Sequence, residues 1–239
     1  MVELRDFSIG FKNKELLKDV STLFPPASLN ALIGRNGSGK STLLRAICGL
    51  KDDYSGDILI DGENIRKIPQ ARLAHKLAYV NTQRPRMSNL KCIDIVKLGR
   101  TPYTSWHGKL SPSDNDKIEI ALKLVNMQDY AFRYFNTLSD GESEKIMIAR
   151  AIAQDTGIII LDEPTSFLDL PTRYDLVGLL KNLSEKEGKT ILYSTHELDI
   201  ALKLSDNVAL LESPCLINLP AVEMKAFLKE NHHPFGIII

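Results

Sequence analysis

The feature that most constrains the fold of this chain is a glycine-rich segment, Gly34–Ser41, which fits the pattern G-x-x-x-x-G-K-[ST]. The apolar run Leu29–Ile33 comes directly before it, and Leu43–Ile47 continues after it with helical spacing. Glycines allow successive backbone N–H groups to point at a polyphosphate, and the helix N-terminus directs its positive end at the same anion. Lys40 adds a full charge at the β- and γ-phosphates, and the hydroxyl of Ser41 is a ligand for Mg²⁺. The segment therefore predicts a strand, a phosphate-binding loop and a helix, in that order.

Composition places the chain among ordered globular proteins and argues against one class of partner. Of its 239 residues, 44% are hydrophobic and 25% are charged, a balance typical of a folded domain. Lysine and arginine total 30, and aspartate and glutamate also total 30, so the formal net charge is zero. This balance argues against a general nucleic-acid-binding surface, and we expect no nucleic acid among the partners.

Cysteine usage and hydropathy indicate the compartment. Cys48, Cys92 and Cys215 lie far apart and form no C-x-x-C pair, which argues against a disulfide framework or a structural zinc site and favours a reducing compartment. The opening sequence MVELRDFSIG has charges where a signal peptide has its apolar stretch. No apolar run approaches the ~18–20 residues that span a bilayer. We therefore expect a cytoplasmic chain that reaches a membrane only through another protein.

The distribution of strand-like and helix-like patterns predicts one domain with an insertion. We expect a single domain over residues 1–239, with a core formed by 1–83 and 155–239 and a mostly helical subdomain formed by 84–154. Strands that alternate with helices in the core imply a mostly parallel sheet covered on both faces. The expected strands are Val2–Phe11, Leu16–Phe24, Leu29–Ile33, Ile58–Ile60, Leu77–Val80, Ile158–Leu161, Ile191–Tyr193 and Val208–Leu211. The expected helices are Leu43–Ile47, Cys92–Leu98, Asp116–Val125, Lys145–Gln154, Tyr174–Lys186 and Leu198–Leu204.

Two carboxylates at the end of an apolar strand form the second candidate site. The strand Ile158–Leu161 is followed by Asp162 and Glu163, a pattern that, taken alone, equally fits a buried strand with an exposed acidic end. After a phosphate-binding loop it is typical of a Walker B segment, in which Asp162 binds Mg²⁺ directly or through water. Glu163 would then orient and deprotonate a water that attacks the γ-phosphate.

Three single residues after predicted strands add to this chemistry. Gln83 follows the strand Leu77–Val80, and its amide could reach Mg²⁺ and the attacking water. His196 follows another strand and could contact the γ-phosphate, although a lone histidine in such a loop is more often incidental. Asp169 lies shortly after the carboxylate pair.

The segment Leu138–Glu142, with the sequence Leu-Ser-Asp-Gly-Glu, precedes a strongly helical stretch. Taken alone, it is an ordinary N-capped helix start, with Ser139 or Asp140 as the cap. Ser139, the backbone of Gly141 and the helix N-terminus also form an anion-binding surface that has no phosphate site of its own beside it.

The ordered set of motifs resembles the ATP-binding subunit of an ABC transporter, over at least Leu4 to Leu211. The resemblance implies a P-loop NTPase fold of the RecA-like type, with N-terminal antiparallel strands and a helical subdomain inserted into the nucleotide-binding core. It implies ATP and Mg²⁺ as ligands, with the metal held by Ser41, Gln83 and Asp162. The residues that it assigns to ATP are Phe11, Gly34, Arg35, Asn36, Gly37, Ser38, Gly39, Lys40, Ser41 and Thr42, although Phe11 equally fits ordinary core packing. The residues that it assigns to catalysis are Glu163, His196, Gln83 and Lys40.

The same resemblance implies a head-to-tail homodimer that encloses two nucleotides. Leu138, Ser139, Asp140, Gly141 and Glu142 occupy the signature position, which more often reads Leu-Ser-Gly-Gly-Gln. The serine and the second glycine of that position in one subunit contact the γ-phosphate bound by the other. Asp169 resembles the D-loop residue at the dimer seam.

Two departures from the common signature bear on substrate and affinity. Asp140 replaces a glycine, and its carboxylate should weaken ATP binding unless it points away; Glu142 replaces the usual glutamine. The form Leu-Ser-Asp-Gly-Glu nevertheless resembles that of importers of iron–siderophore, haem and cobalamin complexes. Leu98–Arg100 with Tyr103–Trp106, and Ile148–Asp155, add to this likeness. The region Glu212–Ile239 departs more, because Ser213-Pro214-Cys215 replaces the usual glycine-containing hairpin.

The resemblance implies transport energised by ATP. ATP binding would close two copies, hydrolysis would reopen them, and the motion would pass to integral-membrane permease subunits that dock around Gln83 and Arg84–Asn89. The uptake branch also implies an extracytoplasmic substrate-binding protein and a peripheral position at the cytoplasmic face of the inner membrane. A soluble ABC-type ATPase, such as an iron–sulfur-cluster assembly ATPase, has the same hydrolytic residues, but the segment Leu98–Trp106 favours the importer. A third possibility is a module that uses ATP only to hold a dimer together, and Glu163 and His196 argue against it.

Overall fold

The structure of the chain is a computed structural model, which describes residues 1–11, 14–81, 89–104 and 108–231; the side chains of residues 11 and 14 are outside the described part. Its centre is a six-stranded sheet with the order β10-β9-β3-β8-β7-β6. The neighbouring strands from β9 to β6 run parallel, whereas β10 pairs antiparallel with β9. These strands are β3 (Leu29–Ile33), β6 (Leu77–Val80), β7 (Ile158–Leu161), β8 (Thr190–Thr195), β9 (Asn207–Glu212) and β10 (Cys215–Pro220).

The parallel strands are buried on both faces, as their continuous apolar composition predicts. Every residue of β3 and of β8 is buried. Because successive side chains of a strand point to opposite faces, they enter two different cores: Ala31 and Ile33 pack in one, and Leu32 packs in the other. The sheet therefore separates two apolar layers.

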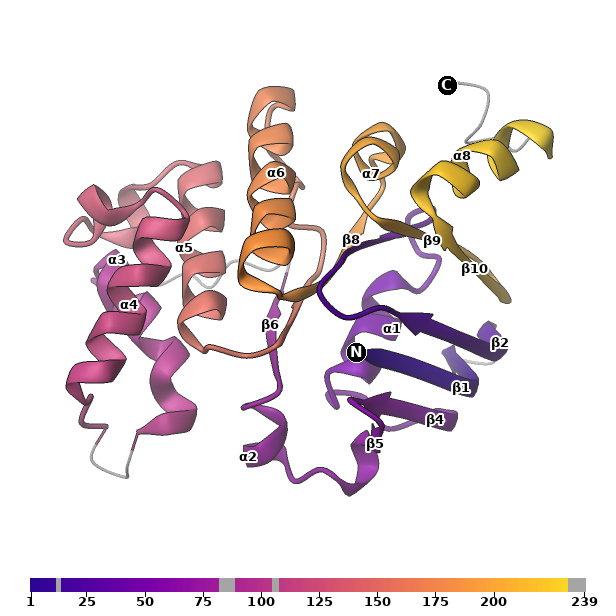
Figure 1. Ribbon diagram of the computed structural model, residues 1–239, viewed down its shortest axis with the longest axis horizontal. Coiled ribbons are helices and arrows are strands. Elements are labelled where there is room, and N and C mark those ends of the chain that lie inside the picture. Colours follow the sequence, from indigo (N-terminus) through magenta and orange to yellow (C-terminus); the bar gives the residue numbers. More distant parts are fainter. Residues whose placement is uncertain (12–13, 82–88, 105–107, 232–239) are drawn as a thin grey trace.

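One face of this sheet is covered by a helix and a second sheet. The second sheet is antiparallel and has the order β2-β1-β4-β5, with β1 (Val2–Phe11), β2 (Lys14–Phe24), β4 (Ser55–Ile60) and β5 (Glu63–Asn64). Helix α1 (Lys40–Ile47) shares a core with both sheets, since Phe7, Leu44 and Ile160 belong to one buried cluster. The phosphate-binding loop thus leads into a helix that is packed on two sides (Figure 1).

The opposite face is covered by helices. Their buried residues form one cluster with the other face of the parallel sheet. These helices are α3 (Cys92–Lys97), α4 (Pro112–Leu124), α5 (Asp140–Ala153), α6 (Leu170–Glu187), α7 (Leu198–Leu204) and α8 (Ala221–Glu230), and the short α2 (Gln70–Leu73) precedes β6. Figure 1 shows α3, α4 and α5 together at the end of the molecule farthest from the antiparallel sheet. None of the helices in the described ranges has the length and apolar character needed to cross a bilayer.

The predicted α/β class, with a parallel sheet and N-terminal antiparallel strands, is confirmed. Each expected strand and helix is present, and α3 and α7 begin where predicted, but α1, α4, α5 and α6 begin three to five residues before their apolar spacing does. The reason lies in their caps: Ser111, Ser139 and Asp169 accept hydrogen bonds from the first turns of α4, α5 and α6, so polar residues start these helices. Among the strands and α-helices of the described residues, four were not predicted: β5, α2, β10 and α8.

Candidate functional site

The loop between β3 and α1 has the backbone that its glycines predict. Gly37 and Gly39 have φ values of 76° and 109°, which disfavour any residue with a side chain. A Cβ on Gly39 would lie only 3.2 Å from Leu16 Cδ1, so glycine is also needed for the close approach of β2. The loop ends at Gly39, which caps α1 without a side-chain hydrogen bond. The backbone N–H groups of this helix start are thus left for another acceptor.

Lys40 is buried in this loop, with only 4% of its side chain exposed. Its Nζ donates to the carbonyl of Gly34 at 3.0 Å and lies 3.4 Å from Oε1 of Glu163. The ammonium is therefore fixed between the loop and the end of β7. A phosphate group entering here would meet a positive charge that is already positioned and only partly screened by water.

Asp162 lies at the centre of a buried hydrogen-bond network. Its Oδ1 accepts from the hydroxyl of Ser41 at 2.9 Å and from the hydroxyl of Ser194 at 2.8 Å. Ser194 Oγ also accepts from the backbone N–H of Glu163, at 2.8 Å. This network brings the ends of α1, β7 and β8 together, because the carboxyl ends of parallel strands meet at one edge of the sheet.

The donor set at Asp162 fits Mg²⁺. Mg²⁺ prefers oxygen ligands and is commonly held by one or two protein groups together with substrate phosphates. Asp162 and Ser41 provide such oxygens 2.9 Å apart. Within the described ranges no group of three or more His, Cys, Asp or Glu side chains could enclose a metal, so a cation here would depend on phosphate oxygens for the rest of its ligands.

Glu163 faces the same space as Lys40. Its backbone adopts a φ of 50°, a conformation rare for a residue with a side chain, and its side chain is 24% exposed. Oε2 accepts a hydrogen bond from Ser166 Oγ at 3.1 Å. The strained turn after β7 directs a carboxylate, held on both oxygens, toward solvent beside the loop.

These groups surround a cavity of about 400 Å³. Its lining residues are Leu16, Asn36, Gly37, Gly39, Lys40, Ser41, Thr42 and Glu163. Beside it, the buried hydroxyl of Ser38 lacks a hydrogen-bond partner among the described residues, and the carbonyl of Arg35 accepts from the N–H of Ser38. Most of the residues predicted to bind ATP are therefore found in one place.

His196 follows β8 but is not among the residues that line this cavity in the described part of the chain. Its side chain is 48% exposed, and its Nε2 lies 3.2 Å from Oε1 of Glu197. Gln83 is outside the described residues, as is the side chain of Phe11. The proposed roles of these three residues thus remain predictions.

The signature segment lines a second cavity of about 400 Å³, which shares none of its described lining residues with the first. Its lining residues are Ser139, Asp140, Gly141, Glu142, Lys145, Phe167, Leu168, Asp169 and Thr172. The structure thus brings four of the five predicted signature residues and Asp169 together, apart from the lining of the first cavity, whereas Leu138 packs against the apolar core instead.

The start of α5 is a capping box. Ser139 Oγ accepts from the N–H of Glu142, and the carboxylate of Glu142 accepts from the N–H of Ser139 at 2.8 Å. This backbone hydrogen bond holds the pKa of Glu142 below its usual value. Of the two caps considered from the sequence, Ser139 is therefore the actual one, and Asp140 is the first residue of the helix.

Gly141 and Asp169 are positioned by the neighbouring helix α6. A Cβ on Gly141 would lie 2.9 Å from Cγ2 of Thr172, so α5 and α6 approach closely here. Asp169 caps α6 by accepting from the N–H of Thr172 at 3.2 Å, and hydrogen bonds with Thr172 lower the pKa of Asp169.

Two residues of the first site were missed from the sequence. Ser194 contacts both Asp162 and Glu163. The sequence signal that could have identified it is its position at the carboxyl end of β8, the strand that neighbours β7. Leu16 forms part of the cavity wall from β2, and nothing local in the sequence indicates that this strand passes over Gly39.

Comparisons with known proteins agree with this geometry. The family model described as "ABC transporter" matches residues 17–166. The petrobactin import ATP-binding protein FpuC of Bacillus anthracis is 37% identical over 182 residues, which cover 76% of this chain and 67% of that protein. The iron(3+)-hydroxamate import ATP-binding protein FhuC of Bacillus subtilis is 32% identical over 87% of this chain and 78% of that protein.

Solved structures are also similar. One is a proposed metal-chelate type ABC transporter in an inward-facing conformation, with a TM-score of 0.84, 25% identity, and coverage of 97% of this chain and 88% of that one. Another is a dimeric ATP-binding cassette in a post-hydrolysis state with ADP and Pi, with a TM-score of 0.77, 26% identity, and coverage of 92% and 99%. The architecture is therefore that of a P-loop NTPase cassette.

Proposed function

This chain belongs to the ABC transporter family, and we propose that it binds and hydrolyses ATP to energise the uptake of an iron complex, a siderophore in the first place, with haem and cobalamin as further candidates. The observation that carries this proposal is the cluster of Lys40, Ser41 and Glu163 in the wall of one cavity, with the buried Asp162 bonded to Ser41 behind them. The importer names of several relatives support the substrate class.

In the proposed reaction, the loop and Lys40 bind the β- and γ-phosphates of ATP, and Lys40 stabilises the charge on the transferred group. Asp162 and Ser41 would hold Mg²⁺, which neutralises phosphate charge when bound. Glu163 would orient a water for in-line attack and accept its proton, with the ammonium of Lys40 3.4 Å from its Oε1. Gln83 and His196 would contact the metal and the γ-phosphate.

The second cavity supports a dimer with shared sites. Ser139, Gly141 and the N-terminus of α5 offer an anion-binding surface, and this surface has no phosphate loop of its own beside it. A second copy, placed head to tail, would bring its bound ATP to this surface, with Asp169 at the seam. The dimeric form of a similar cassette supports the arrangement.

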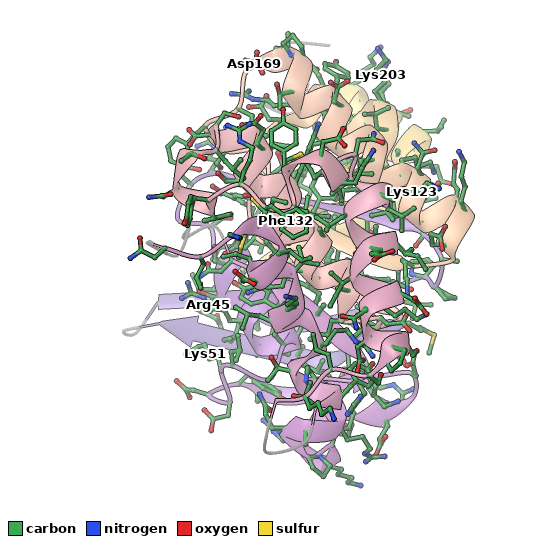
Figure 2. The ribbon with its side chains drawn as sticks, turned by 90° about the vertical axis from the view of Figure 1, so that its left-hand side faces the viewer. Arg45, Lys51, Lys123, Phe132, Asp169 and Lys203 are labelled. Atoms are coloured by element: carbon green, nitrogen blue, oxygen red, sulfur yellow. The ribbon has the colours of Figure 1, made fainter. Side chains whose placement is uncertain are left out.

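Permease subunits are the proposed membrane partners, and they would dock next to the predicted contact segment, residues 84–89. Two hydrogen bonds, from Cys92 N–H to the carbonyl of Arg133 and from Phe135 N–H to the carbonyl of Leu90, join the residues that follow this segment to the turn before α5. The turn exposes Phe132, 73% accessible, and Tyr134 beside a partly exposed Leu90. Figure 2 shows Phe132 near the middle of the face formed by the helical end of the molecule. This apolar surface would place the protein at the cytoplasmic face of the membrane, with a substrate-binding protein on the far side.

The alternative of a soluble iron–sulfur-cluster assembly ATPase is less well supported, because the relatives reported above are named for import or transport. Copurification of the chain with detergent-solubilised permease subunits would support the importer. Uptake of labelled siderophore that is unchanged in cells without the chain would argue against it.

Steady-state phosphate release with Glu163→Gln tests the enzymatic part. We expect turnover to fall by about 10²-fold or more, as for loss of a catalytic base, while ATP binding persists and the dimer accumulates with ATP bound. Thr101→Ala, a change at an exposed threonine of the helical end, is the control and should turn over normally. Near-normal turnover of Glu163→Gln would contradict the assignment.

A further inference from the structure

An ion-pair network lies beside the proposed catalytic site and is not used by the mechanism above. Arg173, in the first turn of α6, donates from Nε to the carbonyl of Leu168 at 2.8 Å and from Nη1 to Oε1 of Glu197. The same Oε1 of Glu197 lies 3.2 Å from Nε2 of His196. One carboxylate therefore joins Arg173 to His196.

Arg173 is placed unfavourably for its own helix, whereas the carboxylate of Glu197, at the start of α7, has the sign of charge that a helix N-terminus favours. A cation in the first turn of a helix meets the positive end of its dipole, and Arg173 is in that position on α6. Glu197 is the N-cap of α7, but its side chain makes no capping hydrogen bond. Its carboxylate turns instead toward Arg173 and His196.

The network runs from the signature cavity to the residues that follow β8. Leu168, the acceptor of Arg173 Nε, lines the signature cavity together with Asp169. His196 follows β8, only two residues after Ser194, which contacts Asp162 and Glu163. A shift of the Leu168 carbonyl would displace the guanidinium of Arg173. The carboxylate of Glu197 would then lose its charge-assisted hydrogen bond with Arg173, and its position beside the imidazole of His196 would change.

We propose that Arg173 and Glu197 are positioning residues that set the orientation of His196 and couple it to the segment Leu168–Asp169. This inference rests on the proposed function, which gives His196 the γ-phosphate contact. Oε1 of Glu197 lies 3.2 Å from Nε2 of His196 and also accepts the hydrogen bond from Arg173, so Arg173 fixes the carboxylate against which the imidazole rests. A partner subunit that presses on Leu168–Asp169 thereby changes the availability of His196 for ATP.

The first test reads His196 directly and does not depend on ATP hydrolysis. The full chain, labelled with ¹³C at histidine Cε1, contains five histidines, and the signal of His196 is assigned by its loss in His196→Asn. We expect both Glu197→Gln and Arg173→Ala to move this signal, although Arg173 acts only through Glu197. Lys181→Ala, which removes another ion pair made by α6, with Asp206, is the matched control and should not move it. An unmoved His196 signal in Arg173→Ala overturns the proposal.

The second test is kinetic. Arg173→Ala and Glu197→Gln should each lower kcat about 10-fold, within the range caused by misplacing a catalytic group, while the KM for ATP changes less than two-fold. The double variant should lose no more than either single variant, because both act through one network. Glu197→Asp, which keeps the carboxylate, should recover part of the loss. If the fold-losses in kcat of the two single variants multiply in the double variant, the proposal is overturned.

Failure of the proposed function would appear differently. If the wild-type chain released no phosphate with Mg²⁺ and ATP, the enzymatic assignment would fail, and the histidine spectra would still decide whether Arg173 reaches His196 through Glu197. Thermal unfolding of each variant separates a local effect from loss of the fold.

Discussion

The ammonium of Lys40 is buried between a carbonyl and a carboxylate, so its removal has two effects on ATP. The phosphates lose a charge-assisted contact, and Glu163 loses the cation beside it. We predict that Lys40→Ala weakens ATP binding by about 10- to 100-fold, the range for loss of a hydrogen bond to a charged group. Titration calorimetry with MgATP measures this, and Lys123→Ala on α4 is the control. Unchanged affinity would exclude the phosphate role of Lys40.

Asp140 is the residue at which the signature departs most from the common pattern, yet the start of α5 is built by its neighbours. The capping box of Ser139 and Glu142 does not include the Asp140 side chain. We predict that Asp140→Gly keeps turnover within about two-fold, since a glycine in the first turn of a helix costs about 1 kcal/mol or less. Phosphate release is the measurement. A ten-fold loss would assign a specific task to this carboxylate.

At this scale the sequence predicted the residues that share a local motif and missed those that meet only in three dimensions. Lys40, Ser41 and Asp162 were identified because a fixed spacing or the end of an apolar strand marks them. Ser194 and Leu16 belong to no local motif. Ser194 lies at the site because β8 is next to β7, and Leu16 lies there because β2 of the antiparallel sheet passes over the loop.

Among the elements, the contact between α5 and α6 depends on the missing side chain of Gly141. A Cβ there would overlap Thr172 Cγ2 at 2.9 Å. We predict that Gly141→Ala lowers the free energy of unfolding by about 1–3 kcal/mol, the usual cost of overpacking, which corresponds to a fall in Tm of roughly 2–12 °C. Thr172→Ser removes the overlapping methyl group, so the double variant should recover much of the loss in calorimetry. No recovery would place the effect elsewhere.

The start of α4 gives a prediction on pH. Hydrogen bonds with Ser111, followed by the contact with Arg100, lower the pKa of Asp114 to about 2. Because the folded-state pKa is depressed, this carboxylate stabilises the fold above its unfolded pKa of about 3.9, and the contribution disappears as the pH falls toward about 2.

Thermal unfolding between pH about 4.5 and about 2 tests this. The Tm of the wild type should fall more steeply with acid than that of Asp114→Asn, in which the titrating group is gone. Asp116→Asn, the same change at an exposed neighbour on α4, is the control. Parallel curves for the wild type and Asp114→Asn would contradict the assignment.

Most elements could be predicted because their apolar periodicity or continuous apolar runs are set by burial. The elements that were missed lack this signal. Strand β10 is only partly buried along most of its length and lies at the edge of its sheet, so its residues follow no clear alternation. Its strand conformation comes from pairing with β9, which a local pattern does not report.

In the whole molecule, the two cavities have no described lining residue in common, which fits the proposed dimer in which one chain holds the triphosphate and a second chain closes the site. We predict that phosphate release per chain falls steeply as the protein is diluted below the dimer dissociation constant. Analytical ultracentrifugation at the same concentrations supplies the monomer fraction. Constant turnover per chain in a sample that sediments as a monomer would contradict the shared site.

The last hairpin has a consequence for how the molecule is made. Ser213 Oγ donates to the carbonyl of Glu15, 198 residues earlier, and Lys18 N–H donates to the carbonyl of Pro214. These bonds fix β2 on both sides of Leu16, a wall of the phosphate cavity. While the ribosome is still translating the chain, the early strand has no hairpin to fasten it. We therefore expect the nucleotide pocket to reach its final shape only after residues 213–214 have been synthesised and have folded against β2.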